Sequence, residues 1–285
     1  GLESIPRKVA IRPIPEDVFE PITVPVIFHI VAPRSVAHTF TSIHAEDIQK
    51  LIDRANRVFK NDIIHAPSSI DSKITFELVT HDPYGNELEE KGVHRVEVSD
   101  DVYLDTYIKN NFIWDPNLYL NIYISDFDAT KTNLPPYILN NGVQLKMEDI
   151  RKVNSVADAK NYNLYDVGIG ITRSNFYIMT SYGYGLEDLL GTFYGLYPSY
   201  YGIGRGIKDD FCDDTYTAAH VYMCLEKWTY LGTDQNGNSI QNGQEIYYNS
   251  YQIMDAYSPA YTITYDQVKR IRTVMENCPF RMMRK

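Results

Sequence analysis

Cysteine is scarce in this chain of 285 residues, which contains three of them and no C-x-x-C pair. Three cysteines cannot build a disulfide framework, and the missing C-x-x-C pairs exclude a zinc ribbon and a thioredoxin-like redox site. A single bridge plus one free thiol stays open, and the sequence does not select the pair. The three cysteines are Cys212, Cys224 and Cys278.

Long apolar runs and positive charge are also lacking. The longest apolar run, ITVPVIFHIVAP, is too short and too β-branched to form a membrane-spanning helix. Lys and Arg number 27 against 37 Asp and Glu, so the net charge is −10 at pH 7. A chain of this charge repels the phosphates of nucleic acid, and we therefore expect no nucleic-acid partner.

The first residues lack an initiator Met and a signal peptide, and they carry prolines at Pro6, Pro13 and Pro15. We interpret residues 1–21 as an extended N-terminal tether, because proline-rich segments favour extended conformations. A secreted or lipid-anchored parent protein is the corresponding hypothesis.

What the sequence does contain is an alternation of strand and helix patterns. Apolar residues at helical spacing predict an amphipathic helix over 44–62, and a second helix is expected over 100–112. This order indicates an α/β fold (α+β in some schemes), with a mixed twisted sheet backed by long helices. β-Branched runs predict the strands over residues 22–31, 72–82, 92–98 and 118–127.

The second half of the chain shows weaker patterns. We interpret residues 128–163 as an irregular excursion that contains a short helix at 147–153. Residues 165–176 alternate like a strand, and a helix is expected over 215–231.

Two kinds of local signal close the chain. The dipeptides Asn236-Gly237 and Asn242-Gly243 predict turns. Thr264 and Gln267 form a T-x-x-Q capping box, which predicts the start of a final helix. The buried stripe of that helix is expected to consist of Val268, Ile271 and Val274.

The order of several short motifs resembles that of one family. The strand VPVIFHIV, the helix AEDIQKLIDRANRVF and the strand LYLNIYI precede a helix that ends in GLY, and CDDT and YQIMDAYS follow. This order is similar to that of the pappalysin branch of the metzincin zinc peptidases, especially the zinc-peptidase-like lipoproteins of Bacteroides-type bacteria. The resemblance covers nearly the whole chain after the tether. It implies a metzincin-like catalytic domain, with an upper subdomain over residues 22–197 and a small irregular lower subdomain over 198–285.

The resemblance also implies where a zinc site would lie. The family signature is H-E-x-x-H-x-x-G-x-x-H, in which three histidines bind zinc and the glutamate acts as general base. Aligned on GLY, the family glycine falls on Gly195. The three ligand positions fall on Asp188, Thr192 and Pro198, and the glutamate position falls on Leu189. None of the seven histidines forms an H-x-x-x-H pair elsewhere, so we expect neither zinc nor catalysis.

Met254 in YQIMDAYS matches the methionine of the family's Met-turn, although core packing alone would also explain this residue. In the family a tyrosine often follows two residues later and helps to stabilise the tetrahedral intermediate. Here that position is Ala256, and Tyr257 stands one residue further along the chain. This departure agrees with lost catalysis.

Two clusters near this motif have two interpretations each. The tyrosines could form a stacking platform for a peptide or glycan, or their rings could fill the space left by the metal. The acidic run KDDFCDD could bind calcium, but it lacks the residue order of a calcium loop, which favours a solvated or capping loop. The tyrosines are Tyr177, Tyr182, Tyr184, Tyr194, Tyr197, Tyr200 and Tyr201, and the acidic residues are Asp209, Asp210, Asp213 and Asp214.

We therefore predict a catalytically inactive metallopeptidase-like protein, a pseudopeptidase, that is exported to the bacterial cell envelope and binds a peptide or glycan in the inherited cleft. Two further hypotheses compete with this one. The first is an active zinc endopeptidase with unusual ligands, in which Asp188 would be required. The second is a surface glycan-binding module built on Tyr200 and Tyr201.

Overall fold

The structure of the chain is a computed structural model. It describes side chains and backbone in most of the chain, and the backbone alone in the ranges 224–233 and 239–247. The described residues are 19–64, 69–199, 210–215, 224–233, 235–236, 239–247, 252–255 and 260–283.

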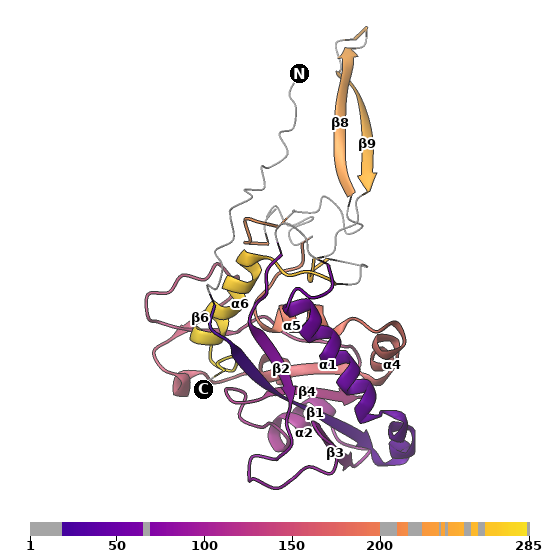
Figure 1. Cartoon of the computed structure of the whole chain (residues 1–285), viewed down its shortest axis with the longest axis vertical. Helices are drawn as coiled ribbons and strands as arrows, with labels where there is room; N and C mark the ends of the chain where they lie inside the picture. Colours follow the sequence, from indigo (N-terminus) through magenta and orange to yellow (C-terminus); the bar gives the residue numbers. More distant parts are fainter. Residues whose placement is uncertain are drawn as a thin grey trace.

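A five-stranded sheet forms the centre of the fold (Figure 1). The long strand β1 (Ile22–Pro33) has β4 (Leu120–Ser125) on one side, and β7 (Gly168–Thr172) lies beyond β4. On its other side β1 pairs with two short strands in succession, β2 (Ile74–Leu78) at its start and β3 (Val93–Val98) at its end. The strand predictions for this half of the chain are confirmed.

Every strand pairing within this sheet is parallel, whereas the sequence suggested a mixed sheet. At the edge of the sheet next to β7 the structure describes an isolated antiparallel bridge between Lys131 and Gly170, with N–O distances of 2.8 and 2.9 Å, and a second one joins Glu90 to Val93 at the start of β3. Long connections return the chain to the same end of the sheet before each new strand, which is what a parallel arrangement requires.

Helices cover both faces of β1, and this explains its continuous apolar sequence. Helix α1 (Ala45–Phe59) packs its predicted apolar stripe against one face, in the same cluster as Phe28 and Ile30. On the opposite face Val31 packs with Ile108 of helix α2 (Leu104–Asn111).

The region between β4 and β7 differs from its prediction in one element. Residues 151–153 form β6 (Arg151–Val153), which pairs with β5 (Tyr137–Leu139), where a short helix was expected. A short 3-10 helix, η2 (Val156–Asp158), follows β6 in the same region, and a longer one, η1 (Arg34–Ser42), lies between β1 and α1.

The strand predicted over residues 165–176 is in fact three elements. It begins within α3 (Leu164–Val167), continues as β7 and ends in α4 (Arg173–Tyr182). The strand stops at Thr172 because the Thr172 side chain accepts a hydrogen bond from the Asn175 N–H and so caps α4.

The prediction of a helix over residues 215–231 is wrong for the residues that the structure describes. Residues 224–233 form strand β8 (Cys224–Thr233), which pairs antiparallel with β9 (Ser239–Tyr247). Asn236 lies in the turn between these strands, as predicted, whereas Asn242 and Gly243 lie inside β9. Figure 1 shows this hairpin extending away from the body of the fold.

The final helix α6 (Tyr265–Asn277) confirms its capping box. The Thr264 side chain accepts a hydrogen bond from the Gln267 N–H at 3.3 Å, and the Gln267 side chain accepts one from the Thr264 N–H at 3.0 Å. The predicted stripe of Val268, Ile271 and Val274 is fully buried.

Cys212 and Cys278 are buried free thiols, and burial raises the pKa of both. Within the described residues, no helix combines the length and the apolar character that a membrane crossing requires.

Candidate functional site

Helix α5 (Leu186–Phe193) carries the positions at which the sequence resembles a zinc motif. Its first turn is anchored by Glu187, which is 1% exposed. One Glu187 oxygen accepts a hydrogen bond from the Gly185 N–H at 2.8 Å, and the other lies 3.2 Å from Nε of Arg54 on α1. Burial raises the pKa of Glu187, and Arg54 opposes that rise. The ion pair therefore holds the start of α5 against α1.

The far end of α5 is a tight turn at Gly195, where φ is +89°. A side chain there would be strained, and its Cβ would also lie 2.8 Å from Cγ2 of Val274 on α6. Two buried arginines hold the turn. Arg270 donates to the Gly195 carbonyl at 2.6 Å, and Arg281 donates to the Phe193 carbonyl at 2.7 Å.

Met254 packs directly against the middle of α5. It is 4% exposed, and a Cβ built on Gly191 would overlap its sulfur atom. The Ser199 N–H donates to the Met254 carbonyl at 3.1 Å, which joins the chain after the Gly195 turn to the segment that carries Met254. The structure therefore places Met254 beside α5, within the main core. Ala256 and Tyr257 lie outside the described residues.

The four positions that correspond to zinc chemistry are accessible from solvent. Asp188 is exposed, whereas Leu189, Thr192 and Pro198 are partly exposed. Asp188 and Thr192 are four residues apart and so share a helix face. Desolvation by the surrounding protein raises the pKa of Asp188 to about 6, and the charge of Glu187 adds to this rise, although the Asp188 side chain keeps contact with water.

These donors do not fit a catalytic zinc ion. Such an ion takes three protein ligands of the His, Cys, Asp or Glu type, and here one carboxylate stands beside a hydroxyl and a proline. Leu189 cannot accept a proton from a metal-bound water. Across the described part of the chain, no cluster of three or more His, Cys, Asp or Glu side chains has a geometry that could hold a metal ion.

The tyrosines predicted to surround the cleft divide into two groups. Tyr194 and Tyr197 are 0% and 2% exposed, so these two rings cannot contact a ligand, and their assignment to a binding surface is corrected. Tyr197 accepts a hydrogen bond from the Glu148 N–H at 3.0 Å, and Tyr194 packs edge-on against Phe193.

The other tyrosines lie nearer the surface. Tyr182 is 69% exposed, and its ring centroid lies 5.9 Å from that of Tyr184, just before α5 begins. Tyr177 is partly buried, and its hydroxyl lies 2.6 Å from the Ser42 hydroxyl. Tyr200 and Tyr201 lie outside the described residues.

Two aspartates of the acidic run accept hydrogen bonds from nearby backbone N–H groups and hydroxyls. Asp210 accepts hydrogen bonds from the Cys212 N–H at 3.1 Å and from the Thr215 hydroxyl at 2.6 Å. Asp214 accepts from the Thr264 hydroxyl at 2.7 Å and from the Asp266 N–H at 2.9 Å, so it caps α6.

These contacts favour the capping interpretation over a calcium site. The Asp213 N–H donates to Asp266 at 3.1 Å, and Asp209 lies outside the described residues.

Sequence reasoning missed the polar side chains that support α5. Glu187, Arg54, Arg270 and Arg281 are all largely buried. Their partners are far away in the chain, so no local pattern distinguishes them from the charged residues on the surface.

Comparison with solved structures finds proteins of similar fold. Mature mirolysin from Tannerella forsythia, in complex with a cleaved peptide, is 18% identical over 92% of this chain and 95% of its own, with a TM-score of 0.56. Mirolysin is a metzincin-type zinc metallopeptidase. The chain has a metzincin-type fold.

A second mirolysin structure, in complex with a compound, supports this metzincin-type fold. It is 17% identical over 90% of this chain and 92% of its own, with a TM-score of 0.57. At such identities the likeness establishes the fold alone. Neither the models of known protein families nor the curated proteins give a match.

Proposed function

We propose that this chain is a catalytically inactive member of the metallopeptidase-like proteins, a pseudopeptidase that binds an extended peptide in the cleft beside α5. One observation carries the proposal. The frame of the motif is retained in Gly191, Gly195 and Met254, while the residues at the ligand and base positions lack the required chemistry.

The edge of the sheet supports a peptide ligand. Residues 130–132 run along the outer side of β7, where the backbone of Lys131 pairs with Gly170. The backbone N–H groups of Thr130 and Thr132 make no hydrogen bond with other described residues. An extended peptide can add to such an edge as a further strand. The mirolysin structure with a cleaved peptide shows that a protein of this fold holds a peptide.

The surface beside α5 adds two features that a peptide could use. Tyr182 and Tyr184 offer adjacent aromatic rings, and Asp188 offers an exposed carboxylate. The ligand that these groups suit best is an extended peptide with an aromatic or apolar residue close to a basic one. We further propose that the protein acts in the bacterial cell envelope, where peptides from outside the cell would reach it.

The test exposes the purified protein to a peptide library and analyses both the retained peptides and the supernatant by mass spectrometry. We expect retained peptides to be intact and no cleavage products to appear. The variant Thr132→Pro removes a backbone donor and should weaken binding, whereas the matched control Thr132→Ala keeps the donor and should bind normally. Cleavage products, or binding on a glycan array without any peptide binding, would contradict the proposal.

A further inference from the structure

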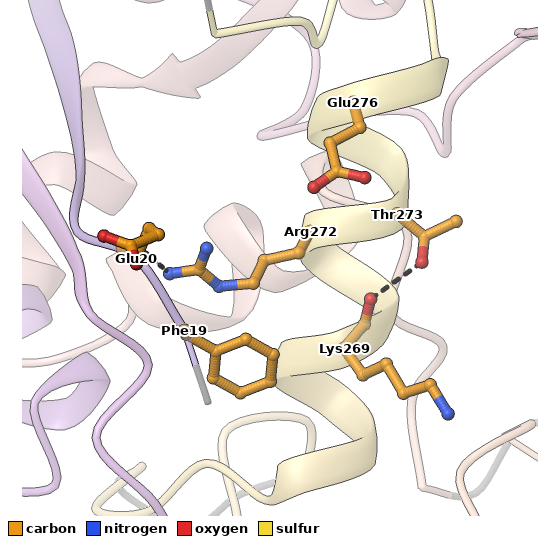
Figure 2. Close-up of a pocket in the computed structure, with 6 residues that line it drawn as sticks. All are labelled: Phe19, Glu20, Lys269, Arg272, Thr273 and Glu276. Atoms are coloured by element: carbon orange, nitrogen blue, oxygen red, sulfur yellow. Dashed lines mark hydrogen bonds between the residues drawn. The ribbon is translucent and has the colours of Figure 1, made fainter. Parts of the chain in front are cut away.

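A pocket lies between α6 and the residues that lead into β1, and it shares no lining residue with the α5 site. Its volume is about 330 Å³. Four of its residues occupy one face of α6, because they are spaced by three, four and seven positions from the first. The lining residues, shown in Figure 2, are Phe19, Glu20, Lys269, Arg272, Thr273 and Glu276.

Arg272 is the residue that makes this pocket unusual. It is 7% exposed, and its Nη2 donates to the carbonyls of Glu20 and Ser72 at 2.7 and 2.8 Å. Its buried Nε has no hydrogen-bond partner among the described residues. The ring of Phe19 lies 4.6 Å from the guanidinium carbon.

The positive charge of Arg272 also has no close anionic partner. Among the described ion pairs none includes Arg272, although Glu276, Asp71 and Glu20 are near enough to act on its charge. Buried charges in proteins are normally paired, because an unpaired one loses its hydration without compensation. Nε is buried, so the donor that remains for an acceptor entering the pocket is Nη1, for which the described residues supply no hydrogen bond.

The other side chains of the lining restrict which acceptor fits. Arg272 and Lys269 contribute two positive charges, and Glu20 and Glu276 contribute two negative ones. A simple anion would be attracted by Arg272 and repelled by the two carboxylates. A simple cation would be attracted by the carboxylates and repelled by Arg272 and Lys269. A ligand that carries both charges can place its negative group beside Arg272 and its positive group beside a carboxylate, so both contacts are attractive.

We propose that this pocket binds a small zwitterion of the α-amino-acid class. The ligand carboxylate would accept hydrogen bonds from Arg272, its ammonium group would lie beside Glu276, and an apolar side chain would pack on Phe19. Phe19, Arg272 and Glu276 all line this pocket, and Figure 2 shows the Arg272 guanidinium between the other two side chains. The volume lies at the lower end of the range for ligand pockets, which suits a small molecule.

Three related compounds test the charge requirement by isothermal titration calorimetry on the full chain. L-Phenylalanine carries both charges, 3-phenylpropionate lacks the ammonium group, and 2-phenylethylamine lacks the carboxylate. We expect phenylalanine to bind at least about tenfold more tightly than either of the others, because each charged contact contributes a charge-assisted hydrogen bond. Equal binding of all three, tighter binding of 3-phenylpropionate, or no binding of phenylalanine at about 10 mM would overturn the proposal.

A substitution at an exposed lining residue tests the site without removing hydrogen bonds of the fold. Glu276 is exposed, so Glu276→Gln should weaken phenylalanine binding about tenfold and leave 3-phenylpropionate binding unchanged or stronger. The control Glu97→Gln removes the same charge at an exposed position on β3 and should change neither. Arg272→Gln also removes the bonds to Glu20 and Ser72, and Glu276→Gln therefore decides the result if that variant does not fold. Unchanged phenylalanine binding in Glu276→Gln would contradict the proposal.

Discussion

The contact between Gly191 and Met254 predicts a strong coupling between two residues that are far apart in the chain. In Gly191→Ala the new methyl group would overlap the Met254 sulfur. Overpacking of this kind costs about 1–3 kcal/mol, and the better helix propensity of alanine returns about 1 kcal/mol. We therefore expect a net loss of up to about 2 kcal/mol in the free energy of unfolding.

The second single variant and the double variant complete the cycle. Met254→Ala leaves a cavity and should cost about 2–5 kcal/mol, because Met254 is buried in the main core. In the double variant the methyl group that Gly191→Ala introduces occupies part of that cavity, so the combined loss should be smaller than the sum by about 1 kcal/mol or more.

Urea denaturation of all four proteins measures the three differences. Losses that add to within about 0.5 kcal/mol would show that the two residues are not in contact, and would refute the packing of Met254 against α5.

Three further predictions concern buried polar groups. Burial and the nearby His94 lower the pKa of His29 to about 3, so the folded state resists protonation and stability should fall as pH drops below about 6.5. From pH 7 to about pH 5 the wild type should lose about 2 kcal/mol more than His29→Gln in denaturation experiments, and parallel curves would refute this. Burial raises the pKa of Asp255 to about 7, so the wild type should lose stability relative to Asp255→Asn as pH rises from about 4 to 7. Thermal melts in which the wild type gains stability over this pH range would contradict the prediction. Arg281→Met leaves the buried carbonyls of Phe193 and Asp166 and the partly buried carbonyl of Asn133 without this donor, and it should cost about 3 kcal/mol or more. A loss below about 1 kcal/mol in urea denaturation would be inconsistent with these bonds.

The elements that the sequence predicted well are those whose signals are local and agree with tertiary packing. The capping box at Thr264 and the apolar stripe of α6 lie within eleven residues, and both appear in the structure. The continuous apolar run of β1 is explained by helices on both of its faces.

The predictions that failed depended on contacts that no local pattern contains. The segment 224–231 has apolar residues that suit a helix or a strand, and its pairing with β9 decides for the strand. The same pairing places Asn242 opposite Thr229, where the Asn-Gly dipeptide does not form a turn.

The candidate site was located through the resemblance of the sequence to a family, and the residues that hold α5 in place were found only in the structure. The alignment on Gly195 marked the position of the motif, but nothing in the sequence alone placed Met254 against Gly191. Arg270 and Arg281 hold the Gly195 turn. Arginine is usually a surface residue, so the sequence did not mark these two as buried, and only their hydrogen bonds in the structure reveal this role.

Zinc content distinguishes most sharply a chain that has lost its metal site from an active zinc peptidase. The wild type and a variant with Asp188→His, Leu189→Glu, Thr192→His and Pro198→His are purified in the presence of zinc, dialysed together and analysed by inductively coupled plasma mass spectrometry. Our account predicts no stoichiometric zinc in the wild type and substantial zinc in the variant, because the helix, the turn and Met254 already provide the frame. One tightly held zinc ion per wild-type chain, together with chelator-sensitive cleavage of peptides, would contradict it.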